Sequence, residues 1–390
     1  MFKIIRVLKE PIAITGFSSL SNLGSQPQEI WENYQQEKIF FSSLEGDFVG
    51  SLNAEAHQQV QALRYENKHY EKLDKTVLMA VLSGRRATQQ AGWNTRDNFG
   101  INLGSSRGAT ALFEAYHKTF ILTGATPTQS SPQTTLGNIA TWVAQDLKAR
   151  GPVISHSITC STALHAILNG IAWITSGMTN KFLVGGSEAP LTPFTLAQMK
   201  AMKLYANHHH HSYPCRSLDF TKKQNTMVLG EGGGSICLER ETNQAQLAKI
   251  IGIGYAVDSL EHAVSISAEA DCFQASMKMA MEGLDKNSVD AIVMHAPGTM
   301  KGDLSETKAI QQVFGDQIPL CTSTKWKTGH TFGASGVLSI ELALFMMEHQ
   351  EFIPVPFQGE SPYPVTLYRI MVNAVGFGGN AVSILLERSA

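Results

Sequence analysis

One stretch of ten residues constrains this chain more than any other, because it places a cysteine where a strand is expected to meet a buried helix. The stretch covers residues 157–166 and reads Ser-Ile-Thr-Cys-Ser-Thr-Ala-Leu-His-Ala. An apolar pair at 153–154 leads into residues 155–159, which we expect to be extended. Residues 163–174 are apolar on nearly every side, which predicts a buried helix. Cys160 would then lie at the first turn of that helix, where free backbone N–H groups and the helix dipole favour a thiolate over a thiol.

This stretch alone leaves two interpretations of Cys160 open. A sharp turn from strand to helix is a known way to present a nucleophile. Small polar residues also begin helices for ordinary capping reasons, and cysteine is among the residue types most often buried. An inert buried thiol is therefore the commoner outcome for such a pattern, and the rest of the chain has to decide between the two.

The composition of the 390-residue chain excludes several classes of protein. Its 31 basic and 33 acidic residues nearly balance, so nothing indicates binding to nucleic acid or to an anionic membrane surface. Five cysteines without paired spacing predict neither a disulfide framework nor a zinc site, and they favour a reducing compartment. Residues 1–10 lack the features of a signal peptide, and no apolar run is long enough to span a bilayer. We therefore expect a cytoplasmic protein.

Apolar runs and helical patterns alternate along the first part of the chain, which predicts strands that alternate with helices. The expected strands cover residues 11–17, 99–103, 181–184 and 234–239, and further helices are expected over residues 73–92 and 134–147. Such alternation favours a mostly parallel sheet that is covered by helices.

A second series of the same kind follows. Its expected strands and helices cover, in order, residues 248–257, 273–284, 291–295, 304–314, 319–323, 334–347, 369–374 and 381–387. Both series close an expected strand with Leu-Glu-Arg, at residues 238–240 and 386–388. These parallels predict an internal duplication into two layered α/β halves, residues 1–243 and 244–390.

An irregular segment around residues 206–217 contains His208, His209, His210 and His211. Four adjacent histidines with a cysteine nearby form a composition that can bind metal. Metal ligands on one face of a fixed element need a spacing such as i and i+4, which four neighbours do not supply. A solvated loop is the better interpretation, and we predict no metal site.

Three later segments hold further candidate residues. His295 ends an expected strand, where reactive groups of α/β folds collect, although a lone histidine there is more often structural. Lys325 and His330 lie in a loop rich in small residues, 323–336, directly before an apolar helix. The last segment, residues 373–380, holds a phenylalanine flanked by glycines, whose backbone freedom allows close approach to a ligand.

In their order along the chain, the cysteine turn and these three segments resemble the β-ketoacyl-acyl-carrier-protein synthases, the elongating condensing enzymes of the thiolase superfamily. The resemblance covers nearly the whole chain and includes further motifs at residues 14–16, 185–189, 216–219 and 230–234. It implies a thiolase-like α/β fold, duplicated into five αβαβα layers, with the active site where the two halves meet. It also makes Cys160 a candidate nucleophile rather than an inert thiol.

The resemblance implies a role for each candidate residue. Cys160 takes an acyl chain from a carrier-protein thioester. His295 and His330 promote decarboxylation of a malonyl unit to an enolate, which attacks the acyl thioester. Lys325 supports the histidine electrostatics. The backbone N–H groups of Cys160 and Phe377 form the oxyanion hole, and Phe377 gates the acyl pocket. The implied activity is that of a 3-oxoacyl-[acyl-carrier-protein] synthase, an acyltransferase that forms a carbon–carbon bond.

The same motifs discriminate among relatives. His330 stands where chain-initiating relatives have asparagine, and the last glycine-rich loop lacks the second cysteine of the thiolases. Subunits of the chain-length-factor kind usually have glutamine where this chain has Cys160. The resemblance assigns contacts with phosphopantetheine or substrate to Thr299, Gly378 and Gly379.

Several positions depart from the pattern of the family. Pro297 replaces a hydroxyl residue expected near the phosphopantetheine arm, no threonine precedes Asn380, and Val375 replaces a phenylalanine. Ser339 stands where a glutamate is common, and Glu341 lies about 200° further around the helix, so we expect it to face elsewhere. These departures indicate a specialised pathway, such as polyketide or polyene synthesis, rather than general fatty-acid synthesis.

The resemblance also implies partners, but no metal or organic cofactor, because both substrates arrive on the phosphopantetheine of an acyl carrier protein. We expect a homodimer, or a heterodimer with a chain-length-factor subunit, whose interface around residues 131–140 contributes to the acyl tunnel. The basic candidates for docking the carrier protein are Lys200, Lys203, Arg216, Lys222 and Lys223.

Two rival hypotheses remain open. In the first, the chain is a non-catalytic chain-length or scaffold subunit that retains Cys160 and both histidines. In the second, it is an acyltransferase of the thiolase superfamily that uses Cys160 without decarboxylation.

Overall fold

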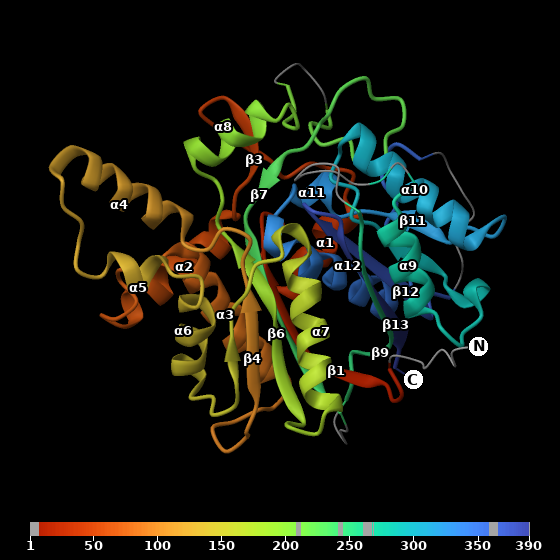
Figure 1. The fold of residues 1–390 in the computed structure, drawn as a ribbon, viewed down its shortest axis with the longest axis horizontal. Coiled ribbons are helices and arrows are strands. Elements are labelled where there is room, and N and C mark those ends of the chain that lie inside the picture. Colours follow the sequence, from red (N-terminus) through yellow and green to blue (C-terminus); the bar gives the residue numbers. More distant parts are fainter. Residues whose placement is uncertain are drawn as a thin grey trace.

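The computed structural model of this chain describes residues 8–207, 212–240, 245–259, 267, 269–358 and 366–389. These residues form two layered α/β halves that share one large sheet (Figure 1). The predicted loop with His208, His209, His210 and His211 lies outside the described residues.

The first half begins with β1 and ends with β8. Its strands are β1 (Ile12–Leu20), β2 (Ser42–Leu44), β3 (Asp47–Gly50), β4 (Gly100–Gly104), β5 (Val153–Ile154), β6 (Lys181–Glu188), β7 (Leu229–Gly230) and β8 (Gly232–Glu239). Its helices are α1 (Pro27–Gln35), α2 (Ala54–Glu66), α3 (Lys75–Gln90), α4 (Thr110–Thr123), α5 (Ser130–Thr134), α6 (Asn138–Leu147), α7 (Thr162–Thr175) and α8 (Pro193–Ala201).

The second half begins with β9 and ends with β13. Its strands are β9 (Ala248–Val257), β10 (Ala291–Val293), β11 (Leu320–Thr322), β12 (Arg369–Gly376) and β13 (Asn380–Arg388). Its helices are α9 (Asp271–Ala280), α10 (Met300–Phe314), α11 (Lys325–Thr328) and α12 (Ser335–His349).

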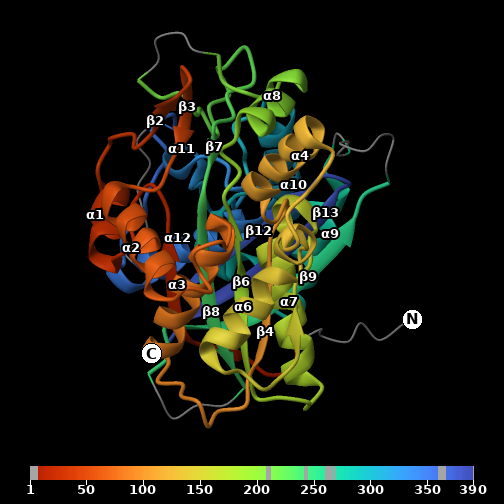
Figure 2. The same ribbon diagram turned by 90° about the vertical axis from the view of Figure 1, so that its left-hand side faces the viewer.

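The large sheet has the strand order β11-β10-β12-β13-β9-β1-β8-β6-β4-β5, so each half contributes a block of neighbouring strands. The two blocks join where β1 pairs with β9. Helices α7 and α12 lie in the middle of the molecule and contact strands of both blocks. Helices α3 and α6 cover the first block on its outer side, and α9 and α10 cover the second (Figures 1 and 2). This is the five-layered αβαβα arrangement that the resemblance implied.

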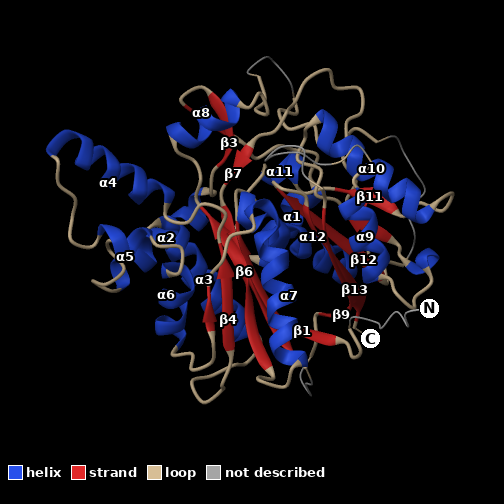
Figure 3. Cartoon of the chain, viewed as in Figure 1, coloured by secondary structure: helices blue, strands red, loops and turns tan. Residues whose placement is uncertain are grey.

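The large sheet is mixed, and the prediction of a mostly parallel sheet is wrong. Parallel pairs join β4 to β5 and β6, and β10 to β11 and β12. Antiparallel pairs connect all the strands between these two edges (Figure 3). The turn at residues 377–379 shows one reason, because so short a connection joins only antiparallel strands. A pattern of alternating apolar runs carries no information about this reversal of direction.

The expected extended segment at residues 155–159 is also wrong. β5 ends at Ile154, and the chain then leaves the sheet. At the next residue, the hydroxyl of Ser155 donates to the carbonyl of Leu103 at 2.9 Å. A 3₁₀ turn, Thr159–Ser161, leads directly into α7. The other expected strands and helices are present with ends that differ by a few residues.

Close packing of the two central helices positions both halves of the site. All of α12 from Ser335 to Met347 is buried, as expected of a helix that is apolar on most sides. At Gly336 this helix touches α7, because an added Cβ would lie 2.8 Å from Cγ of Leu164. No helix in the described part of the chain combines the length and the apolar character that a membrane crossing requires.

We expect Gly336→Ala to destabilise the protein by about 1–3 kcal/mol, because the added methyl group would overpack the contact with Leu164. Thermal unfolding followed by circular dichroism measures the loss. Gly137→Ala is the matched control, since a Cβ at Gly137 has no atom within 4 Å. If both variants unfold at the same temperature, the close packing of α7 against α12 is not supported.

Candidate active site

Five of the predicted site residues line one cavity of about 500 Å³, namely Cys160, His295, Thr299, His330 and Phe377. Cys160 reaches it from the turn before α7, and His295 from the segment after β10. His330 reaches it from the segment between α11 and α12, and Phe377 from the turn between β12 and β13. Cys160 belongs to the first half and the other four residues to the second. The cavity therefore lies between the halves, where the resemblance places the active site.

Thr299 and the remaining predicted residues differ in their relation to this cavity. Thr299 lines it and also caps α10, where its hydroxyl accepts from the backbone of the first turn. Lys325 is buried but is not part of the lining. Gly378 and Gly379 form the turn between β12 and β13 with φ values of 89° and 68°, and they do not line the cavity, whereas Gly376 does.

A tight turn fixes Cys160 at the start of α7. Thr159 has a φ of 45°, and the hydroxyl of Thr162 donates to its carbonyl at 2.6 Å while accepting from the N–H of Ile158 at 2.9 Å. Gly376 packs against this turn so closely that a Cβ there would lie 2.1 Å from Oγ1 of Thr159. Only glycine fits at that position. This turn and Gly376, which packs against it, together hold the Cys160 side chain at the cavity.

The expectation of a resting thiolate at Cys160 is wrong. Burial raises the pKa of the Cys160 thiol to about 12, and the nearby carboxylate of Glu188 adds to the rise. Lys325 and Arg107 lower this pKa without outweighing burial. Cys160 is therefore a neutral thiol at rest and has to lose its proton as it attacks.

His295 and His330 are both buried and neutral. Their rings meet edge to face, with centroids 5.3 Å apart and planes at 85°. Burial lowers the pKa of His330 to about 3 and that of His295 well below its ordinary value, and the charge of Lys325 lowers both further. Oγ of Ser335 lies 2.9 Å from Nδ1 of His330. A Ser335 hydroxyl that donates there leaves the ring proton on Nε2.

Two buried carboxylates, which the sequence reasoning did not assign, hold the loops that carry these histidines. Glu306 of α10 accepts from the backbone N–H groups of His295 at 3.0 Å and Ala296 at 2.9 Å. Glu188, at the end of β6, accepts from the N–H of Gly333 at 3.0 Å, just after the His330 segment. Burial raises the pKa of each carboxyl to about 7. An acidic residue at the end of an apolar strand was the sequence signal for Glu188.

Lys325 lies beside the cavity without a close carboxylate. Its Nζ is 3.4 Å from the hydroxyl of Ser339, and no carboxylate of the described residues forms an ion pair with it. Burial lowers the pKa of Lys325 to about 8, although Glu306 acts in the opposite direction. Glu341 faces away, as the spacing predicted, and accepts from the hydroxyl of Tyr34 at 2.9 Å.

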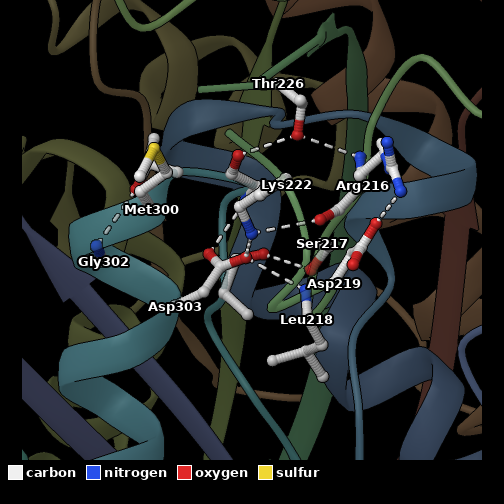
Figure 4. A network of polar contacts seen from close by, with 12 residues as sticks. Arg216, Ser217, Leu218, Asp219, Lys222, Thr226, Met300, Gly302 and Asp303 are labelled. Atoms are coloured by element: carbon white, nitrogen blue, oxygen red, sulfur yellow. Dashed lines mark hydrogen bonds and ion pairs between the residues drawn. The ribbon is translucent and has the colours of Figure 1, made fainter. Parts of the chain in front are cut away.

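A buried ion pair anchors the loop after β10 (Figure 4). Nζ of Lys222 lies 2.5 Å from Oδ2 of Asp303, and the two side chains are 3% and 1% exposed. Asp303 also accepts from the backbone N–H groups of Leu218 and Gly298, each at 3.0 Å. The hydroxyl of Thr226 donates to the carbonyl of Gly298 at 2.9 Å. These contacts tie the segment before β7 to the loop that carries His295.

We expect Lys222→Met to destabilise the protein by about 3–5 kcal/mol, because it leaves the charge of Asp303 buried without a partner. Urea unfolding measures the loss. Lys223→Met is the matched control, since Lys223 is the exposed neighbour in the same segment. Equal stability of the two variants would contradict a structural role for the ion pair.

Comparisons with known proteins agree with this geometry. Residues 9–244 match the family described as Beta-ketoacyl synthase, N-terminal domain, and residues 247–356 match its C-terminal domain. The chain is 28% identical over 370 residues to Nodulation protein E of Rhizobium meliloti (strain 1021), with 90% of each chain covered. It is 27% identical over 419 residues to 3-oxoacyl-[acyl-carrier-protein] synthase 2 of Staphylococcus aureus (strain COL), with 97% of this chain and 98% of the relative covered.

Among solved structures, the chain is similar to a ketosynthase from Xenorhabdus doucetiae in complex with its chain length factor. The TM-score is 0.80 at 22% identity, over 97% of this chain and 98% of the other. A likeness at this level of identity concerns the fold, and it confirms the expected thiolase-like architecture. Since the family match covers both halves, this chain belongs to the β-ketoacyl synthase family.

Proposed function

We propose that this chain catalyses the decarboxylative Claisen condensation of an acyl thioester, first transferred to Cys160, with malonyl-acyl carrier protein. One observation carries the proposal: a single buried cavity brings together a thiol and two neutral imidazoles. Cys160 is the nucleophile, and His295 and His330 are the groups that act on the malonyl unit. Membership of the β-ketoacyl synthase family supports this reaction.

The first step transfers the acyl group to Cys160. As sulfur attacks the donor carbonyl, the thiol proton passes to a neutral imidazole. A protonated imidazole could not accept this proton. The N–H groups of Cys160 and Phe377 would stabilise the tetrahedral oxyanion. The bond between the carbonyl and the carrier sulfur then breaks, and the departing carrier thiolate takes the proton from the imidazolium.

The second step generates the carbon nucleophile. The bond between the malonyl carboxylate and Cα breaks, carbon dioxide leaves, and the electron pair forms an enolate on the thioester. N–H donors of His295 and His330 would stabilise the enolate oxygen in a cavity from which water is excluded. Lys325 contributes in two ways, since its charge adds to burial in lowering the pKa of both imidazoles and also favours the anion.

The third step forms the new carbon–carbon bond. Cα of the enolate attacks the acyl carbonyl on Cys160, and the tetrahedral intermediate uses the same two N–H groups as before. Sulfur leaves as a thiolate, which is a good leaving group, and takes up a proton from solvent, so that the whole reaction consumes one proton. The product is a β-ketoacyl chain on the carrier. Thr299, Gly378 and Gly379 would contact the phosphopantetheine arm or the substrate.

An acyl carrier protein is the partner that this reaction requires, and the chain needs no metal or organic cofactor of its own. Of the basic docking candidates, Lys222 is wrong, because its ammonium group is buried against Asp303 and cannot meet a partner. The candidates that remain are Lys200, Lys203, Arg216 and Lys223.

A second subunit of the same fold is proposed for the face that carries α4. This helix projects from the body of the molecule (Figure 1), and Phe113, Phe120, Ile121 and Leu122 are all at least half exposed. In the same half, β5 is an edge strand of the large sheet and contacts α6. An apolar projection of this kind is typical of an interface. A second copy or a chain-length-factor subunit fits it, and α5 and α6 would form part of the contact.

Three further proposals complete this assignment. A cytoplasmic location is supported by the free state of all five cysteines. A boundary between the halves at residues 243 and 244 is supported by the family matches over 9–244 and 247–356. A specialised pathway, polyketide or polyene, is supported by the departures at Pro297 and Ser339.

Intact-mass measurement after incubation with a panel of acyl carrier proteins, followed by malonyl carrier protein, tests the proposed reaction. We expect an acyl adduct on Cys160 and then a β-ketoacyl product. Cys160→Ala should abolish both. His330→Ala should retain the adduct but lose the product, because it removes an enolate donor and not the nucleophile.

The outcome of the same experiment separates the rivals. An adduct without release of carbon dioxide from malonyl carrier protein would favour the non-decarboxylating acyltransferase. Absence of any adduct from every donor would favour a non-catalytic subunit, and the search would then turn to its partner.

Lys325→Met tests the electrostatic role of the lysine. Removing this positive charge should raise the pKa values of His295 and His330, because the charge lowers both in the native protein. Nuclear magnetic resonance of protein with labelled histidine, assigned with single histidine variants, measures the change. Lys301→Met is the control, since Lys301 lines the cavity mouth but is exposed to water. An unchanged or lower histidine pKa in Lys325→Met would contradict the role.

A further inference from the structure

The guanidinium of Arg107 packs on Phe332, a residue that lines the cavity together with Cys160. Arg107 follows β4, and its guanidinium carbon lies 5.4 Å from the centroid of the Phe332 ring. Nη1 of Arg107 donates to the side-chain carbonyl of Gln198 at 2.8 Å. No carboxylate of the described residues forms an ion pair with Arg107. Phe332 lines the cavity together with Cys160, so this charge reaches the surroundings of the sulfur.

The carboxylate of Glu188 raises the pKa of Cys160, and a nearby positive charge opposes this effect. It accepts from the backbone N–H groups of Ser106 at 2.6 Å, Arg107 at 3.0 Å and Gly333 at 3.0 Å. These donors favour the ionised form and join the loop after β4 to the turn before α12. Glu188 therefore has a structural role as an acceptor, although burial raises its pKa to about 7. Its charge also opposes formation of a thiolate on Cys160.

The side chain of Arg107 is placed so that Glu188 does not neutralise it. Its backbone N–H contacts the carboxylate, but its guanidinium turns to a neutral amide, Gln198 of α8, and to an aromatic ring. Both contacts hold a cation without cancelling its charge. Both histidines are neutral, so the charged groups that act on Cys160 are Glu188, Lys325 and Arg107. Glu188 raises the pKa of the thiol, whereas Lys325 and Arg107 lower it.

We propose that Arg107 is a positioning residue of the acylation step, which stacks on Phe332 and stabilises the Cys160 thiolate as the acyl group is transferred. The inference rests on the proposed function. In this step the S–H bond of Cys160 breaks, its proton passes to an imidazole, and sulfur bonds to the acyl carbon. The C–S bond of the donor then breaks, and the carrier thiolate leaves with the electron pair and takes up the proton. The negative charge on sulfur before bond formation is what Arg107 stabilises.

The decarboxylation step places its charge elsewhere, on an enolate oxygen beside the histidines. Loss of the Arg107 charge should therefore slow acylation and leave decarboxylation unchanged. A residue that only maintains the shape of the cavity would affect both steps. This split between the two half-reactions separates an electrostatic role from a structural one.

Variants of the full chain test the inference. Arg107→Met and Arg107→Gln remove the charge, so that one neutral variant remains if the other does not fold, and Arg107→Lys keeps the charge. Alkylation of Cys160 by iodoacetamide over a series of pH values reports the thiolate. We expect the neutral variants to slow alkylation and acylation about threefold to tenfold at neutral pH, with the midpoint displaced to higher pH. Arg107→Lys should restore most of the rate.

Two controls accompany these variants. Arg96→Met, at an exposed arginine, should match the native protein in every assay. The Cys160→Ala variant and the double variant that also carries Arg107→Met should release carbon dioxide from malonyl carrier protein at the same rate.

Several results would overturn the inference. One is a native alkylation profile in the neutral variants. Another is Arg107→Lys being as slow as Arg107→Met, because shape rather than charge would then explain the loss. A third is an equal loss of decarboxylation. If the native protein accepts no acyl group from any donor, the proposed function fails, and the alkylation profiles still decide whether Arg107 acts on the thiolate.

Discussion

Burial of the reacting groups is the physical constraint on which the rest of this site depends. The loss of solvent that raises the pKa of Cys160 also lowers the pKa values of His295, His330 and Lys325. The resting cavity therefore holds a neutral thiol and two neutral imidazoles. Negative charge appears only when substrate is bound, first on sulfur and later on an enolate, and it is not screened by water there. Such a site favours chemistry that creates one anion at a time.

The same constraint explains the carboxylates around the cavity. The loops that carry the catalytic groups are irregular, so their N–H groups need acceptors other than the sheet. Glu188, Glu306 and Asp303 supply these acceptors, and each joins two separate segments. A buried anion has a cost unless a cation lies near it. Lys222 meets this need for Asp303 by direct contact, whereas Lys325 acts on Glu306 from a greater distance.

Sequence patterns predicted the elements of this fold much better than their connections. Apolar runs and helical spacing located β9 and α7 almost residue by residue, because burial of a face or of a whole helix leaves a periodic record. Strand direction produces no such periodic pattern in the sequence, so the prediction of a mostly parallel sheet was wrong. The prediction that Cys160 is a thiolate was wrong because the sequence shows that this residue lies at the start of a helix but not that its side chain is buried. The meeting of Cys160 with His330 came from the family resemblance, since the 169 residues between them hide it from local patterns.

The substitution at Ser339 connects these arguments to mechanism. On α12 a hydroxyl faces Lys325, while the buried carboxylate two residues on, Glu341, faces Tyr34 in the structural core. A carboxylate in the place of Ser339 would neutralise Lys325 by direct contact. With Ser339 there, the positive charge of Lys325 adds to burial in lowering the pKa of both histidines, whose neutral rings can donate to an enolate. The departure from the family pattern thus increases the electrostatic influence of the lysine on the catalytic imidazoles.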